Sequence, residues 1–377
     1  MSAEYDVGVV GAGILGLAHA YHLARRGQRV LVLERHRRAQ GASVRNFGMI
    51  WPIGQPLGPL FHLANRSRDF WLEVLRASGL WHRQSGSLHL AYHDDEAQVL
   101  REFAAESAGS PRHCELWSPL QVAARFPAIV QANLRAALWS PAELAVDPRE
   151  IIAELPGWLS HAHGVDFEFG TTVLGHDLPR VGTTSGEKRV RRLVVCTGAD
   201  FRDLAPEAFR DAGLIPCKLQ MMRSQPFGDR FRLDTHLAAG LTLCHYASFA
   251  NCPTLPALAK RFDAELPEHR RLGIHVLVSQ NGRGELTLGD SHEYGDAIGP
   301  FDDPKIDALI LDYLRTFLAV PDLEIQSRWN GIYVKHPTEA FVIARPAPDV
   351  VAVTGVGGAG MTLSFGLAEK VVNEMFA

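Results

Sequence analysis

The residues best suited to chemistry lie in two glycine-rich turns, one near each end of the chain. The first turn contains Gly11, Gly13 and Gly16, and the second runs over residues 355–360. Glycines at the spacing of the first turn permit a tight turn, a close backbone approach to a pyrophosphate and close helix packing. Because each turn leads into an expected helix, each would offer unpaired N–H groups and a positive dipole end to an anionic ligand.

The elements around the first turn support this interpretation. Residues 7–10 are an apolar run typical of a buried parallel strand, and the following residues have helical apolar spacing up to Gly27. A second apolar strand ends at Glu34, 18 residues after Gly16, where a carboxylate can accept hydrogen bonds from ribose hydroxyls. The pattern predicts an adenine dinucleotide, either NAD or FAD; a purely structural turn is the alternative.

The second turn follows the apolar strand 350–354, and a last helix is expected from about Thr362. If that strand joins the first sheet, a second helix N-terminus reaches the same ligand. Such an end suits a group that becomes anionic, such as the N1–C2=O edge of a reduced flavin. The alternative is close packing of the final helix. The two turns together favour FAD over NAD.

The rest of the chain predicts an α/β protein with two discontinuous domains. Residues 214–294 contain strand-like segments at 219–222, 241–248, 274–279 and 285–288, which indicate an antiparallel sheet. Helices are expected to start at Ser118-Pro119, at Asp147-Pro148 and at Asp302-Asp303-Pro304. We therefore expect a Rossmann-like FAD-binding domain (1–50, 145–213 and 325–377) and an α+β substrate domain (51–144 and 214–324).

Composition excludes several classes of function. The net charge of −4 and the pI near 6.5 give no basis for binding nucleic acid or an anionic membrane. No set among the five cysteines and 17 histidines has zinc-site spacing, so no metal is expected. Residues 237–259 lack charged side chains but include His245 and two prolines, which favours a strand and loop over a membrane span. A cytoplasmic protein without integral membrane association is expected.

Four stretches resemble one known family: Gly11–Glu34, 43–48, 194–199 and 355–362. They are similar, in order and over the whole chain, to the FAD-dependent superfamily of D-amino-acid oxidase, glycine oxidase and sarcosine oxidase. Residues 45–52 and 218–223 look most similar to a bacterial branch associated with aminophosphonate breakdown. That last similarity rests on association and not on a site.

The resemblance implies a set of FAD-binding residues. Gly11, Gly13, Gly16 and Glu34 would hold the ADP half, and Val173 would contact the adenine side. The full implied set is Gly11, Gly13, Ile14, Leu15, Gly16, Glu34, Arg35, Ser43, Arg45, Asn46, Val173, Thr197, Gly198, Gly331, Gly357, Gly358, Gly360, Met361 and Thr362. Gly331 aligns with the flavin-linking cysteine of sarcosine oxidases, so the FAD is expected to be non-covalent.

Two further departures concern the substrate and the electron acceptor. Tyr333 stands where many relatives place an arginine for a substrate carboxylate, and residues 285–289 lack the lysine that sarcosine oxidases use for oxygen. The candidates for substrate contact and catalysis are Arg223, His292, Tyr333, Lys335 and His336, with Arg45 nearby. Each of these side chains could instead be solvated or structural.

The expected activity is oxidation of the C–N bond of a small, amino-acid-like amine with an acidic group, such as an aminophosphonate or an N-methyl derivative. Hydride would pass to flavin N5, the resulting imine would hydrolyse, and oxygen would be the acceptor. A dehydrogenase that uses a quinone, a non-catalytic FAD-binding protein and a tRNA-modifying relative are the alternatives. The sequence does not indicate an oligomeric state.

Overall fold

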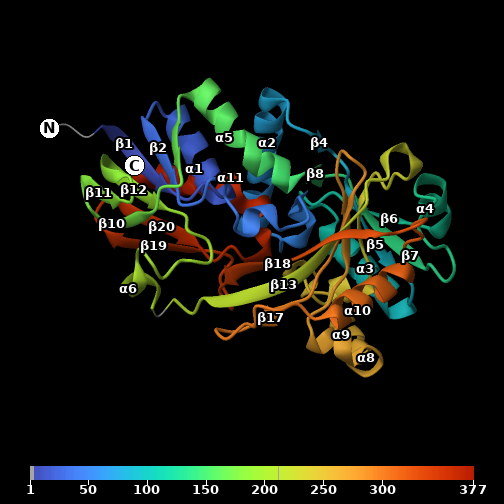
Figure 1. Cartoon of the computed structure of the whole chain (residues 1–377). Coiled ribbons are helices and arrows are strands. Elements are labelled where there is room, and N and C mark those ends of the chain that lie inside the picture. Colours follow the sequence, from blue (N-terminus) through green and yellow to red (C-terminus); the bar gives the residue numbers. More distant parts are fainter. Residues whose placement is uncertain (1–3, 211) are drawn as a thin grey trace.

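The computed structural model describes residues 4–210 and 212–377 (Figure 1). Residues 1–3 and 211, which the predicted cofactor-domain ranges include, lie outside the described part. The two ends of the chain share one lobe, which contains the first and last strands and helices (Figure 1). The second lobe contains the middle of the chain, and the long strands β13 and β18 run between the lobes (Figure 1).

The first lobe contains a parallel sheet with the spatial order β9-β2-β1-β12-β20. Counted along the chain, this order is 3-2-1-4-5, which is the doubly wound Rossmann arrangement. The strands are β1 (Tyr5–Val10), β2 (Val30–Glu34), β9 (Asp166–Phe169), β12 (Gly186–Val195) and β20 (Val350–Thr354), with β10 (Val173–Asp177), β11 (Arg180–Thr183) and β19 (Val342–Ala347) antiparallel at the margin. The predicted Rossmann-like sheet is confirmed.

Helices cover this sheet because the strands are apolar on both faces. One core cluster joins Val7 and Val9 of β1 to Leu17 of α1, Trp71 of α2 and Phe365 of α11. The helices of this layer are α1 (Ile14–Arg25), α2 (Pro59–Ser78), α5 (Pro148–His163) and α11 (Gly360–Met375), and the short α6 (Pro206–Phe209) lies near β19. The last strand of the chain, β20, joins the sheet that contains β1. This was the condition, set from the sequence, for the two glycine turns to share one ligand.

The second lobe is built on a sheet with the path β17-β13-β16-β15-β14-β5-β7-β6 and with β18 on the other side of β13. Its pairs are antiparallel except β14 with β5. The strands are β5 (Ser87–Ala91), β6 (Glu115–Trp117), β7 (Ala136–Ser140), β13 (Ile215–Ser224), β14 (His236–Ala238), β15 (Leu277–Gln280), β16 (Leu286–Gly289), β17 (Glu293–Tyr294) and β18 (Ile325–Lys335). A small third sheet contains β3 (Met49–Ile50), β8 (Leu144–Val146) and β4 (His82–Arg83).

β18 belongs by sequence to the predicted cofactor domain, yet it pairs with β13 from Ile215↔Lys335 to Ser224↔Ile325. This long pairing connects the two predicted domains through one ladder. The domain limits themselves stay a prediction.

The helix starts that the sequence marked are confirmed. Ser118 accepts a hydrogen bond from the Gln121 N–H, and Asp147 and Asp303 cap the next two predicted helices in the same way. The helices of the second lobe are α3 (Asp94–Ser107), α4 (Pro119–Arg125), α7 (Gly240–Leu243), α8 (Leu255–Glu265), α9 (Pro267–Arg271) and α10 (Pro304–Arg315).

The strand expected over residues 241–248 is wrong: this segment forms α7 and a 3-10 turn at Ala247–Phe249. A short, mostly apolar run does not distinguish a buried strand from a buried helix, and Gly240–Leu243 is buried here as a helix. Among the described helices, none combines the length and apolar character that crossing a bilayer requires.

Candidate active site

The first glycine turn joins β1 to α1 at the carboxyl edge of the parallel sheet. Gly11 has φ +99°, and a Cβ there would lie 2.5 Å from the carbonyl oxygen of Cys196. A Cβ on Gly16 would lie 1.8 Å from the carbonyl oxygen of Gly11. Both positions therefore require glycine, for backbone conformation and for close helix packing.

Glu34 lies at the end of β2, beside this turn. One carboxylate oxygen accepts from the Ala12 N–H at 2.9 Å and the other from the His36 N–H at 3.0 Å. These bonds hold the carboxylate at the edge where a doubly wound sheet binds its ligand. The Ser43 hydroxyl accepts from the Ile14 N–H at 3.0 Å, so the predicted 43–48 loop is attached to the start of α1.

The rest of that loop contacts β18. Arg45 donates from Nε to the carbonyl of Gln40 at 2.9 Å and from Nη1 to the carbonyl of Asn330 at 3.0 Å. Gly331 follows directly, and a Cβ on it would lie 3.3 Å from the Arg45 Cβ. The Asn46 amide donates to the carbonyl of Ser43 at 2.9 Å. Two segments that are almost 300 residues apart thus meet where the flavin was expected.

The other residues implied for FAD lie on the same edge of the sheet. Thr354 at the end of β20 donates to the carbonyl of Gly198, which has φ +61°. The Thr197 hydroxyl donates to the carbonyl of Asp200 at 3.1 Å, and Arg35 forms an ion pair with Asp200. Val173 is buried at the start of β10, and the neighbouring Thr171 N–H donates to the carbonyl of Glu34.

The second glycine turn is a 3-10 turn, Gly357–Ala359, and α11 begins at Gly360. The Thr362 hydroxyl accepts from the Trp51 N–H at 2.9 Å, and the Met361 carbonyl accepts from Trp71 Nε1 at 2.7 Å. Neither α1 nor α11 has an N-cap residue whose side chain bonds to its first turn, although the Ile14 N–H of α1 donates to Ser43. Both helix starts can therefore direct N–H groups to an anionic ligand, and this arrangement fits FAD.

Tyr333 and Lys335 lie beside the second turn. The Tyr333 hydroxyl would be 3.9 Å from a Cβ on Gly358, and the Lys335 Cβ 3.4 Å from one on Gly357. The Lys335 ammonium is 4.9 Å from the centroid of the Tyr294 ring. His292 faces this group with its ring 6.4 Å from that of Tyr333. Three of the five predicted catalytic candidates are thus brought together.

Burial governs the protonation of this group. Burial raises the pKa of Tyr333 well above its usual value, so its hydroxyl stays protonated and can donate. Burial also lowers the pKa of His292 to about 4, and the Lys335 charge adds to this effect, whereas the hydrogen bond to Gly273 opposes it. His292 is therefore a neutral imidazole at pH 7.

Arg223 and His336 are directed elsewhere. Arg223 is buried and lies 3.5 Å from Asp147 and 3.4 Å from Glu285, so its charge is already paired. His336 follows β18, and its Nδ1 accepts from the backbone N–H groups of Thr338 and Glu339. A Cβ on Gly213 would lie 3.3 Å from His336 Nε2, so the ring is directed towards Gly213.

The sequence interpretation missed three residues next to His292. The rings of His245 and His275 are 3.7 Å apart between centroids, and Asp290 is buried with Oδ1 3.2 Å from His275 Nε2. These residues come from the loops at 245, 275 and 290, so no local motif joins them. The available signal was weak: His245 and His275 lie within the expected strands 241–248 and 274–279, and Asp290 follows the expected strand 285–288.

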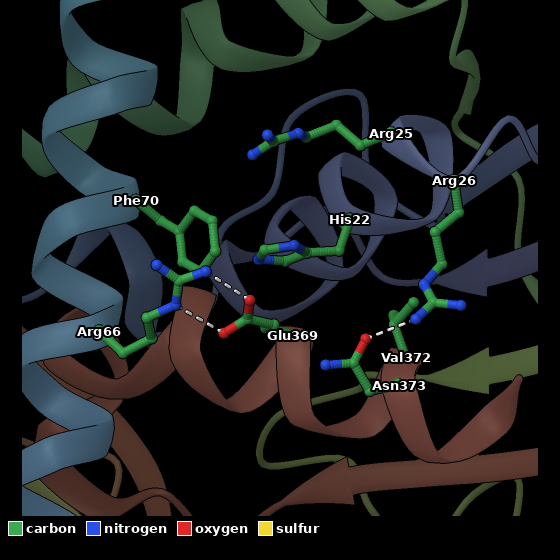
Figure 2. A pocket seen from close by; sticks show the side chains of 8 residues that line it. All are labelled: His22, Arg25, Arg26, Arg66, Phe70, Glu369, Val372 and Asn373. Atoms are coloured by element: carbon green, nitrogen blue, oxygen red, sulfur yellow. Dashed lines mark hydrogen bonds and ion pairs between the residues drawn. The ribbon is translucent and has the colours of Figure 1, made fainter. Parts of the chain in front are cut away.

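A separate surface pocket lies at the far ends of the helices that begin at the glycine turns (Figure 2). Figure 2 shows Arg66 of α2 paired with Glu369 of α11, and Arg26 bonded to Asn373. His22 lies between these pairs. The residues at the pocket are at the C-terminal parts of α1 and α11, so the pocket is distinct from the site at their N-termini.

The fold and the two turns define a flavin-dependent α/β oxidoreductase, and comparison with known proteins agrees. The family model described as "FAD dependent oxidoreductase" (DAO) matches residues 6–374. The chain belongs to this family, so it is an enzyme whose cofactor is FAD.

Individual relatives are distant. A monomeric sarcosine oxidase from Bacillus sp. (strain NS-129) is 25% identical over 100% of this chain and 93% of its own length. Among solved structures, a glycine oxidase from Bacillus cereus has a TM-score of 0.80 at 18% identity, covering 99% of this chain and 95% of its own. An L-proline dehydrogenase from P. horikoshii has a TM-score of 0.79 at 19% identity and covers 99% of this chain and 93% of its own. At these identities, the structural likeness establishes the fold.

Proposed function

We propose that this enzyme oxidises the carbon–nitrogen bond of a small amine that carries an acidic group. The observation that supports this most is the placement of Lys335 and Tyr333 beside the second glycine turn. That turn begins α11, whose N-terminus faces the position expected for the flavin. A substrate anchored at Lys335 would therefore lie next to the cofactor.

FAD supplies the hydride acceptor for such a reaction. The chain's own residues bind the cofactor, orient the substrate and exclude water. We assign the ADP half to the first turn and Glu34, and the flavin to the Arg45 loop, Gly331 and the start of α11. The Tyr333 hydroxyl would donate a hydrogen bond to the substrate, and His292 would line the substrate side of the site as a neutral imidazole.

For the acidic group, we propose a phosphonate or a carboxylate held by Lys335. A lysine ammonium binds as a point charge, whereas an arginine provides the planar fork that suits a carboxylate. Arg223 is paired with two carboxylates and Arg45 donates to two carbonyls. Because neither arginine offers a free fork for a carboxylate, these two positions favour an aminophosphonate over an amine that carries a carboxylate.

For the acceptor, we propose oxygen, with a quinone or another acceptor as the second candidate. The observation behind the second candidate is that β16, with its flanking residue Glu285, contains no lysine. Thr287 is buried in that strand, opposite Arg223 of β13. Turnover measured with oxygen and with an artificial dye would separate the two candidates.

The main test uses the purified, FAD-loaded protein under anaerobic conditions. A panel of small amines, N-methyl amino acids and aminoalkylphosphonates is added, and the flavin absorbance is followed. Bleaching by amines that carry an acidic group, but not by matched neutral amines, is the expected result. If none of them reduces the flavin while dithionite does, the proposal fails and a non-catalytic FAD-binding role is favoured.

A further inference from the structure

Three histidine side chains from separate segments of the second lobe converge on one point. His245 follows α7, His275 precedes β15 and His292 follows β16. One ring nitrogen from each lies within 4.8 Å of the other two. The ring of His275 stacks with those of His245 and His292, at centroid distances of 3.7 and 5.2 Å, and the rings of His245 and His292 are tilted at 4.6 Å. The fold thus gathers imidazoles that lie 30 and 17 residues apart in the sequence.

The orientation of His292 is set by the backbone. Its Nδ1 is 2.9 Å from the carbonyl oxygen of Gly273, which can only accept, so Nδ1 carries the hydrogen. Nε2 therefore has its lone pair free and faces Asp290, whose Oδ2 is 3.9 Å away. A histidine that donates one nitrogen to a backbone carbonyl and presents the other is typical of a metal ligand.

Asp290 lies beside the same rings. Its side chain is nine-tenths or more buried, as is that of His275. Neither Asp290 Oδ1 nor His275 Nδ1 has a hydrogen-bond partner among the described residues. Asp290 Oδ1 is 3.2 Å from the other ring nitrogen, His275 Nε2, but this contact lacks hydrogen-bond geometry. A buried carboxylate without a cation is costly, and a bound divalent ion would compensate its charge.

We propose that His245, His275, His292 and Asp290 bind a divalent transition-metal ion, with Zn²⁺ as the reference ion. Imidazole nitrogens with one carboxylate are a donor set that Zn²⁺ accepts in four-coordinate sites. Metal–nitrogen bonds of 2.0–2.1 Å place ligand nitrogens about 3.3 Å apart, so the nitrogens must draw together by about 1.5 Å at most. The ring of His245 must also rotate out of its stack with His275, so that both nitrogens point at one ion. His245 is the exposed member of the three.

Such an ion would fix the loop that carries His292 against the start of β15. It would also add positive charge close to Lys335, on the side where we place the acidic group of the substrate. The ion takes no part in electron transfer if it is Zn²⁺, which has no redox chemistry. The inference concerns metal binding and does not depend on the amine proposed above.

The test measures metal content in the FAD-loaded protein. The protein is dialysed against a chelator, then against buffer with Zn²⁺, and bound metal is determined by elemental analysis. We expect about one Zn²⁺ per chain in the wild type and less than a tenth of that in His275→Ala and Asp290→Asn. His161→Ala, which changes an exposed histidine of α5, should bind as the wild type does.

A second measurement guards against variants that fail to fold. This measurement uses only the wild type. Added Zn²⁺ should raise its melting temperature, and a chromophoric chelator should remove the bound Zn²⁺ competitively. A wild type that takes up no Zn²⁺, or that is stabilised by inorganic phosphate and not by Zn²⁺, would overturn the proposal. Uptake that persists unchanged in both variants would overturn it as well.

Discussion

The Lys335 ammonium lies 4.9 Å from the centroid of the Tyr294 ring, and the two side chains come from strands on opposite sides of β13. Cys217 of β13 pairs with Tyr294 on one side and with Tyr333 on the other. The aromatic face holds the cation without neutralising it, as a carboxylate would. This leaves the charge of Lys335 able to pair with an acidic substrate.

Lys335→Ala should therefore raise KM for an acidic amine about 10- to 100-fold, because a hydrogen bond to a charged group contributes about 1.5–3 kcal/mol. The effect on kcat should be smaller, since the lysine is proposed to bind and not to react. Steady-state kinetics with the best amine of the panel would measure both. Lys260→Ala, at an exposed position of α8, is the matched control. An unchanged KM in Lys335→Ala would refute the assignment.

Gly16→Ala should reduce FAD binding more than tenfold. The added Cβ would lie 1.8 Å from the carbonyl oxygen of Gly11, so the helix start and the turn must separate. The expected product is a folded protein that is purified with little flavin. The flavin-to-protein absorbance ratio and a titration with FAD would measure the loss, and circular dichroism would establish that the chain is folded.

Gly157→Ala is the control for this substitution. Gly157 lies in α5, where a Cβ meets nothing within 4 Å, and alanine is favoured over glycine in a helix by about 1 kcal/mol. This variant should keep its full flavin content and gain slightly in stability. If Gly16→Ala also retained its FAD, the first turn would be only a structural turn.

The flavin should be released completely by acid precipitation. Gly331 stands where the resemblance to sarcosine oxidases implies a flavin-linking cysteine, and its neighbour Arg45 has no nucleophile. Free cysteines of the second lobe include Cys217, whose pKa burial raises to about 11, so its thiol is unreactive. A colourless pellet and a yellow supernatant are expected. A yellow pellet would show a covalent link elsewhere.

The sequence was most informative where local chemistry decides the structure. The spacing from Gly11 to Glu34 and the Asp147-Pro148 helix start are local signals, and both are found as expected. The 241–248 segment was misjudged because an apolar run has no period that separates strand from helix. The cluster of His245, His275 and Asp290 could not be predicted, since only the pairing of β15 with β16 and the burial of α7 bring its members together.

The substrate candidates were separated by strand geometry, which sequence alone does not supply. Tyr333 and Lys335 share one face of β18, whereas His336 lies beyond the end of that strand. Arg223 was an equally good cation by sequence, but β13 directs it towards Asp147 and Glu285. Buried ion pairs of this kind are recognised only when both partners are placed.

The stability of the protein should fall as pH decreases below 6.5, in part because of His89. This side chain is fully buried in β5, and both of its ring nitrogens lack partners among the described residues. Burial lowers its pKa from 6.5 to about 3. Its contribution to stability is therefore fully present above pH 6.5 and is lost progressively as pH falls towards 3, because the unfolded chain takes up the proton first.

His89→Phe removes this titration and retains a ring that can pack against Trp51 and Phe249. Between pH 7 and pH 5 the wild type should lose about 2 kcal/mol more than the variant, from 1.36 kcal/mol per pH unit below 6.5. Urea unfolding of the FAD-loaded proteins at the two pH values would measure the difference. His161→Phe, at an exposed position of α5, should lose as much stability as the wild type. Equal losses in wild type and His89→Phe would mean that His89 is protonated in the folded protein.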